Sequence, residues 1–97
     1  MPKLSDQEVL KRLGPLAGWE KKGEAISKTY TFETFPGGID FINRIADIAE
    51  QVDHHPDIDI RYRRVTFTIW THSEGGITDK DFDLANRIEE GFTARKG

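Results

Sequence analysis

Three histidines, His54, His55 and His72, are the side chains of this 97-residue chain best suited to move protons near neutral pH. Each falls at the predicted edge of a helix or strand and not inside an apolar stripe. His54 and His55 follow a predicted helix, and His72 ends a predicted strand, so pairing of the neighbouring strands would gather all three at one rim of a sheet. They would then line one cleft. A single histidine at a helix end is more often a solvated side chain that favours the helix dipole, and this alternative stays open for each of them.

Two carboxylates are candidates to orient these rings. Glu50 lies four residues before His54, so on a helix the two side chains would share a face and the carboxylate would favour the protonated ring. Asp81 is expected near His72, from which a short glycine loop separates it. Each carboxylate also has a simpler interpretation. Glu50 would be an ordinary surface partner, and Asp81 would complete a capping box that begins at Thr78.

A metal centre is the main alternative use of three histidines, because catalytic zinc keeps one open position beside its protein ligands. Adjacent His54 and His55 would point apart, whereas two ligands from one element usually share a face, so we expect no metal ion. No Gly-x-Ser-x-Gly segment indicates a serine nucleophile. The glycine pairs at 37–38 and 75–76 are too short for phosphate-binding loops.

Composition narrows the class of protein. Hydrophobic residues make up 36% of the chain and both charge signs are interspersed, which is typical of an ordered globular domain, and we expect one domain over residues 1–97. The net charge of −3 argues against direct binding of nucleic acid. The chain has no cysteine, no apolar signal segment and no run of about 20 apolar residues, which a membrane span needs. We therefore expect a cytoplasmic protein that is neither secreted nor inserted into a membrane.

Capping and periodicity predict the order helix, two strands, helix, two strands, helix. The first helix begins at Ser5 and ends at Gly14, and the last is capped by Thr78. The expected strands are 19–21, 26–32, 58–60 and 65–72, and the central helix is 39–52, after an interruption at 36–38. This order implies an α+β fold, a two-layer sandwich in which three helices cover one face of a mainly antiparallel four-stranded sheet.

The central helix is apolar over more than one face, which indicates either a deep core or a partner chain, so we expect a homo-oligomer. On the fourth strand, Phe67 and Trp70 lie on opposite faces by parity. Only Trp70 is therefore free to approach the face of His72. Packing of Trp70 under a helix is an equally good interpretation.

The spacing of the candidate residues resembles the signature of pterin-4a-carbinolamine dehydratases. It covers about a third of the chain and runs Glu50, three residues, His54-His55-Pro56, five residues, Tyr62, nine residues, His72, eight residues, Asp81. The resemblance implies the fold order given above, no metal or bound cofactor, and assembly into dimers or tetramers through helices and sheet edges. The chain departs from many relatives at Ile58, where they carry an aromatic residue, often tryptophan.

The resemblance also implies a reaction. It would be the dehydration of 4a-hydroxytetrahydropterins, such as 4a-hydroxytetrahydrobiopterin, to quinonoid dihydropterins during tetrahydrobiopterin recycling. By the same resemblance, His54, His55 and His72 would surround the C4a hydroxyl as the catalytic residues, with Glu50 and Asp81 orienting them. Pro56 and Trp70 complete the expected substrate site. The alternative function is a non-catalytic interaction module, because members of this family in higher organisms also act as dimerisation partners of a transcription factor.

Overall fold

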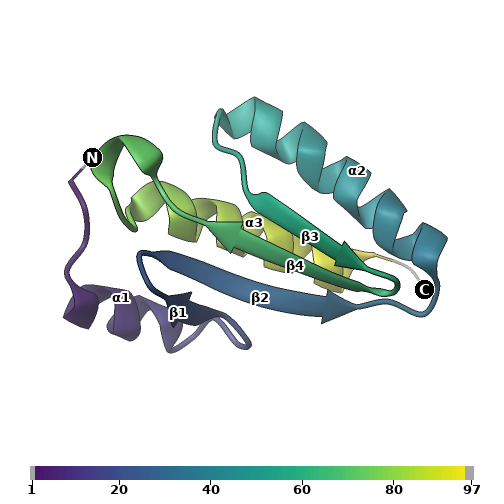
Figure 1. Cartoon of the computed structure of the whole chain (residues 1–97), viewed down its shortest axis with the longest axis horizontal. Helices are drawn as coiled ribbons and strands as arrows, with labels where there is room; N and C mark the ends of the chain where they lie inside the picture. Colours follow the sequence, from purple (N-terminus) through teal and green to yellow (C-terminus); the bar gives the residue numbers. More distant parts are fainter. Residues whose placement is uncertain (1, 96–97) are drawn as a thin grey trace.

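The computed structural model describes residues 2–95 and has an α+β architecture (Figure 1). The elements follow the expected order, with one short 3₁₀ helix, η1, added before the last helix. They are α1 (Asp6–Leu13), β1 (Glu20–Lys22), β2 (Ala25–Thr31), α2 (Phe35–Val52), β3 (Asp57–Arg61), β4 (Arg64–Ile69), η1 (His72–Glu74) and α3 (Asp79–Ala94). Of the single domain expected over residues 1–97, residues 1, 96 and 97 lie outside the described part.

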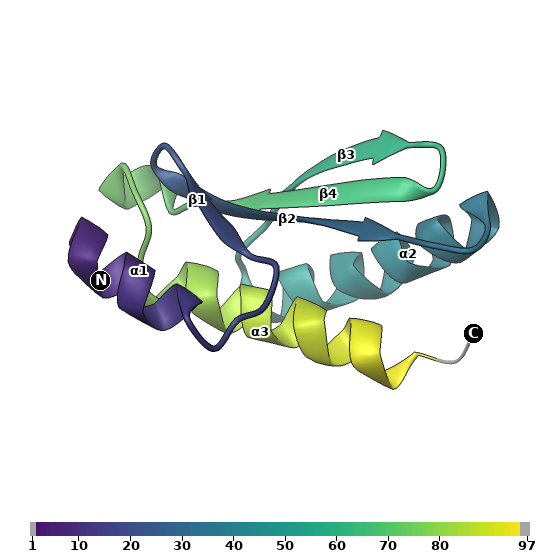
Figure 2. The same cartoon turned by 90° about the horizontal axis from the view of Figure 1, so that it is seen from below.

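Four strands form one antiparallel sheet in the order β1-β2-β4-β3. Its centre is the β2–β4 pair, and β3 lies at one edge. All three α-helices cover the same face of the sheet (Figure 2). The two-layer arrangement predicted from the order of the elements is therefore confirmed.

The core fills the space between the helices and this face of the sheet. In β4, Val65, Phe67 and Ile69 are all fully buried, as expected from the alternation of the strand. From the helices, Ile45 of α2 and Ile88 of α3 are equally buried. The core also contains Val9, Leu16, Trp19, Ile26, Tyr30, Phe32, Phe41, Ile77, Phe82, Leu84 and Ala85. Burial of this apolar surface is the main force that fixes the helices on the sheet.

The central helix begins earlier than the sequence pattern predicts. The prediction placed its start at Ile39, but α2 starts at Phe35, with Thr34 as its N-cap. The hydroxyl of Thr34 accepts a hydrogen bond from the Gly37 backbone N–H, 3.0 Å away. Pro36 lies in the first turn, where a missing N–H removes no helical hydrogen bond. The segment 36–38, expected to interrupt the chain, is thus the opening turn of the helix.

The other end of α2 determines where the first two histidines lie. The helix closes at Asp53, whose backbone is left-handed with φ 53° and ψ 46°. Its N–H bonds to the Ala49 and Glu50 carbonyls, and the His54 N–H bonds to the Ala49 carbonyl at 3.1 Å. A left-handed residue at this position reverses the direction of the chain. His54 and His55 therefore lie outside the helix, in the segment that leads into β3.

None of the helices within residues 2–95 is both long enough and apolar enough to cross a membrane.

Candidate active site

The three histidines line one cavity of about 300 Å³. The sheet explains why segments distant in sequence meet there. Because β3 and β4 are antiparallel, Asp57 at the start of β3 lies opposite Thr68 near the end of β4. The residues just before β3 and just after β4 are consequently at the same end of the sheet. The lining residues are Asp53, His54, His55, Trp70, Thr71, His72, Ser73 and Lys80.

His54 is the most enclosed of the three rings. Its side chain is 12% exposed, and its Nε2 lies 2.6 Å from Oδ1 of Asp81, which is completely buried. The sequence pattern placed Asp81 near His72. In the structure its carboxylate contacts His54 and also Thr71, the residue directly before His72. The turn at Asp53 directs His54 toward the first turn of α3.

Asp81 is held by groups that also begin α3. Its Oδ2 accepts a hydrogen bond from the Thr78 backbone N–H at 2.8 Å and another from the Thr71 hydroxyl at 2.9 Å. With Thr78 as N-cap, Asp81 forms the capping box that the sequence predicts. The same carboxylate thus caps the N-terminus of α3 and contacts His54. Its hydrogen bonds compensate for its burial.

His55 pairs with Glu50, which the sequence pattern assigned to His54 instead. The Nε2 of His55 lies 2.5 Å from Oε2 of Glu50, and both side chains are more than half exposed. The i,i+4 relation that predicted a Glu50–His54 pair requires helical backbone through both residues. Asp53 breaks that continuity, so the partner of Glu50 shifts by one residue.

His72 lies against Trp70. The two ring centroids are 4.0 Å apart, with 37° between the planes. Of the two interpretations left open for Trp70, the structure shows the contact with His72, whereas Phe67 is buried on the opposite face of β4. His72 does not end the strand as predicted, because β4 stops at Ile69 and His72 begins η1. Both rings line the cavity.

Glu50, Asp81 and Pro56 do not line the cavity. Asp81 contacts His54 and Glu50 contacts His55, and both of these histidines line the cavity. Pro56 is a half-buried residue between α2 and β3. No three histidine, aspartate or glutamate side chains in residues 2–95 are arranged to hold one metal ion. The His54–Asp81 and His55–Glu50 contacts are two separate pairs.

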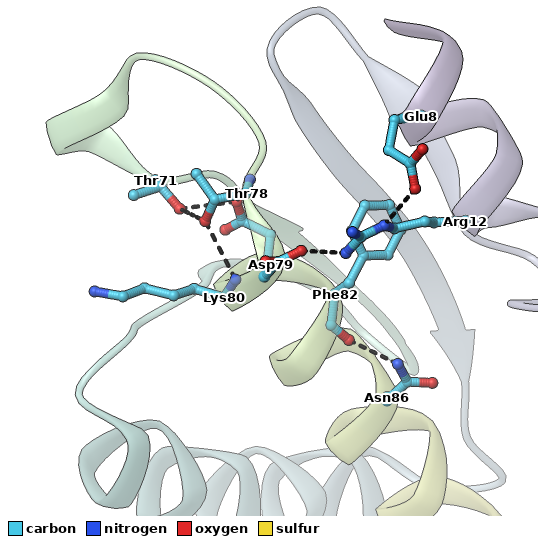
Figure 3. Close-up of polar contacts among 9 residues, drawn as sticks. Glu8, Arg12, Thr71, Thr78, Asp79, Lys80, Phe82 and Asn86 are labelled. Carbon is cyan, nitrogen blue, oxygen red and sulfur yellow. Dashed lines mark hydrogen bonds and ion pairs between the residues drawn. The ribbon is translucent and has the colours of Figure 1, made fainter. Parts of the chain in front are cut away.

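Four lining residues were not predicted as site residues: Asp53, Thr71, Ser73 and Lys80. A signal for Thr71 was present, since it continues the alternation of Val65, Phe67 and Ile69 and should therefore point inward. It does, and it is buried. Lys80 lies in the first turn of α3, and its side chain extends away from Arg12 (Figure 3). No alternation or repeat in the sequence distinguishes Lys80.

The first helix supports this end of α3 from the other side. Arg12 forms an ion pair with Asp79, and its Nε donates a hydrogen bond to Glu8 at 2.9 Å (Figure 3). The guanidinium also lies over the ring of Phe82, 5.8 Å from its centroid. These contacts join α1 to the turn of α3 that contains Asp81.

Comparison with known proteins gives a consistent result. The family described as Pterin 4 alpha carbinolamine dehydratase matches residues 2–91. A provisional pterin-4-alpha-carbinolamine dehydratase of a Roseiflexus species is 51% identical over 88 residues, which is 91% of this chain and 95% of that protein. One from Mycobacteroides abscessus is 53% identical over 89 residues, or 92% of this chain and 95% of that protein.

Similarity extends to a solved structure. The crystal structure of a transcriptional coactivator/pterin dehydratase from Brucella melitensis superposes with a TM-score of 0.88 at 35% identity. The match covers 92% of this chain and 97% of that one. With the fold, the clustered histidines and close relatives over nearly the whole length, this chain belongs to the pterin-4a-carbinolamine dehydratase family, a family of hydro-lyases.

Proposed function

We propose that this protein dehydrates 4a-hydroxytetrahydropterins, of which 4a-hydroxytetrahydrobiopterin is the expected example, to quinonoid dihydropterins. The reaction would serve tetrahydrobiopterin recycling after hydroxylation of aromatic amino acids. The observation that carries the proposal is the single cavity lined by His54, His55 and His72. Its volume of about 300 Å³ lies within the range of small-molecule sites, which begins at roughly 300 Å³.

The chemistry requires two proton transfers. The C4a–O bond breaks as the hydroxyl oxygen takes up a proton and leaves as water, while N5 loses its proton and forms a double bond to C4a. One acid and one base near neutral pH can perform both steps, and imidazole serves in either role. Such transfers typically accelerate a reaction by ~10²–10⁴-fold. Side chains alone supply this chemistry.

We assign the proton transfers to His54 and His72 and a hydrogen bond to the pterin to His55. Asp81 orients His54 through the contact at Nε2, which leaves Nδ1 of the ring for the substrate. Glu50 orients His55 in the same way, but from an exposed position. Trp70 offers an aromatic surface suited to the flat pterin.

A second candidate function is a partner-binding module, since the Brucella melitensis protein is described as a transcriptional coactivator as well as a pterin dehydratase. A module without catalysis has no need of three clustered imidazoles beside an open cavity. The open cavity therefore favours the enzyme.

We also propose that the protein is a homodimer or homotetramer. Strand β3 lies at the edge of the sheet, and all five of its residues are exposed. Ile58 and Ile60 pair with Phe67 and Val65, so they lie on the helix-covered face, yet both stay more than a third exposed. An edge strand with exposed isoleucines is a ready surface for pairing. A second copy of this chain is the expected partner.

The direct test of the dehydratase follows the decay of enzymatically generated 4a-hydroxytetrahydropterin by ultraviolet absorbance. We expect wild-type protein to accelerate the decay, and His54→Ala and His72→Ala to lose most of that acceleration. Arg87→Ala is the control, because Arg87 is an exposed residue of α3 that pairs with Asp83. A pure, folded wild-type protein that leaves the decay unchanged would overturn the proposal and favour the partner-binding module.

A further inference from the structure

Thr71 is a buried hydroxyl between two parts of the site. It lies directly before His72 in the chain, and its side chain reaches Asp81 at 2.9 Å. Its Oγ1 also lies 2.8 Å from Oγ1 of Thr78, and Figure 3 shows this pair at the start of α3. Neither hydroxyl takes part in a step of the proposed reaction.

The direction of each hydrogen bond follows from the number of protons. A threonine hydroxyl has one proton to donate. Thr71 donates that proton to the Asp81 carboxylate. Thr78 must therefore be the donor in the hydrogen bond between the two hydroxyls. Thr78 in turn accepts from the Lys80 backbone N–H at 3.2 Å. The bonds therefore run one way, from Lys80 N–H to Thr78, to Thr71 and to Asp81.

This series of hydrogen bonds ends at His54. Oδ2 of Asp81 already accepts from the Thr71 hydroxyl and the Thr78 N–H, and Oδ1 faces Nε2 of His54. An ionised carboxylate can only accept, so the proton of this contact must belong to Nε2. When the ring is neutral, Nδ1 then has the free lone pair, which is the form that a base at Nδ1 requires.

We infer that Thr71 is a positioning residue: its hydroxyl holds Asp81 in the orientation that keeps the proton of neutral His54 on Nε2. The inference rests on the proposed function for its effect on catalysis, but the position of the proton can be measured without any substrate. Thr71 also connects the segments of the two histidines assigned to proton transfer, because it precedes His72 and acts on His54 through Asp81.

The first measurement uses wild-type protein alone. The ¹⁵N chemical shifts of the His54 ring, recorded by NMR at a pH where the ring is neutral, distinguish a proton on Nε2 from one on Nδ1. We expect the proton on Nε2. A neutral His54 with its proton on Nδ1 would overturn the inference, whatever the protein does to a pterin.

Variants then test Thr71 itself. Thr71→Val keeps the shape of the side chain and removes the hydroxyl, and Thr71→Ser keeps the hydroxyl and removes the methyl group. We expect Thr71→Val to give a mixture of both proton positions on His54 and to lower kcat by about tenfold or more, the scale of losing a hydrogen bond to a charged group. The pH dependence of kcat should shift as well. Thr71→Ser should restore the wild-type NMR signature and most of the activity.

Thr29→Val is the matched control. Thr29 and Thr66 form a similar pair of hydroxyls, 2.7 Å apart, at an exposed position of the sheet, so we expect this variant to behave as wild type. Equal losses in Thr71→Val and Thr71→Ser would show that packing matters and not the hydroxyl, and would overturn the inference. So would a folded Thr71→Val protein with the wild-type NMR signature and pH profile. Wild-type protein without dehydratase activity would instead contradict the proposed function.

Discussion

Oδ1 of Asp81 and Nε2 of His54 lie 2.6 Å apart, although the two residues are 27 positions apart in the chain. The contact joins the segment after α2 to the first turn of α3. Asp81 is fully buried and belongs to a capping box, so hydrogen bonds hold its carboxylate in place. A carboxylate held in this way orients the imidazole and can stabilise the charge that the ring acquires with a second proton.

Replacing Asp81 with asparagine should therefore impair both function and stability. In the variant, the amide N–H group faces donors that in wild type point at a carboxylate oxygen. An amide also does not fix the proton of His54 on Nε2, because it can either donate or accept. We expect kcat for the dehydration to fall by roughly 10²-fold or more. Loss of the buried acceptor should also lower the free energy of unfolding by about 1–3 kcal/mol. Steady-state kinetics and urea denaturation measure the two effects.

The control for this variant is Asp83→Asn, on the same helix. Asp83 is exposed and pairs with Arg87, so its replacement should change neither quantity appreciably. An Asp81→Asn protein with wild-type kcat would show that His54 needs no carboxylate partner.

Glu50→Gln should have a much smaller effect than Asp81→Asn. The Glu50 and His55 side chains are 77% and 55% exposed, and exposed ion pairs contribute only about 0–1 kcal/mol. We expect stability to change by less than about 0.5 kcal/mol. If His55 binds the pterin as proposed, KM should rise modestly while kcat stays close to wild type, which substrate-saturation kinetics would reveal. A loss of kcat as large as that of Asp81→Asn would contradict the assignment of roles.

Much of this arrangement could be predicted from the sequence because it depends on local patterns. The alternation of Val65, Phe67 and Ile69 identifies β4, and Thr78 with Asp81 identifies the start of α3. With the order of the elements, these features determine the layers and bring the histidines to one end of the sheet.

The pairing of carboxylates with histidines could not be predicted in this way. It depends on the left-handed backbone of Asp53, and a non-glycine residue adopts that conformation only where its surroundings favour it. The same limit applies to the start of α2, because Pro36 is compatible both with a break in the chain and with the first turn of a helix.

A charge on the edge strand should separate the proposed oligomer. Ile60 is 43% exposed on β3, and a glutamate there would place a desolvated charge at any interface formed by this strand. We expect Ile60→Glu to be monomeric in analytical ultracentrifugation at concentrations where wild type is a dimer or tetramer. Leu10→Glu is the control, since Leu10 is an exposed apolar residue of α1, far from β3 (Figure 1). A monomeric wild-type protein would rule out the proposed assembly.

The last prediction concerns acid stability and a partly buried hydrogen-bond network centred on Glu89 of α3. Its Oε1 accepts hydrogen bonds from the Tyr30 hydroxyl, from Lys28 Nζ at 2.6 Å and from Trp19 Nε1 at 3.3 Å. Burial is the largest single influence on this carboxyl and acts to raise its pKa. The hydrogen bonds from Lys28 and Tyr30, the charge of Lys28 and the bond from Trp19 together outweigh burial, so the pKa of Glu89 is lowered.

The direction of that shift fixes the direction of the pH effect. A carboxyl whose pKa is lower in the folded protein stabilises the fold at pH above its unfolded value, here 4.5, and this contribution is lost as the pH falls through the folded value. Wild type should therefore lose more of its free energy of unfolding between pH 7 and pH 3 than Glu89→Gln does, measured by urea denaturation at each pH. The exposed neighbour Glu90 offers a control, since Glu90→Gln should keep the wild-type pH dependence. Equal pH dependence in wild type and Glu89→Gln would mean that the charge on Glu89 does not stabilise the contact between α3 and the β1–β2 hairpin.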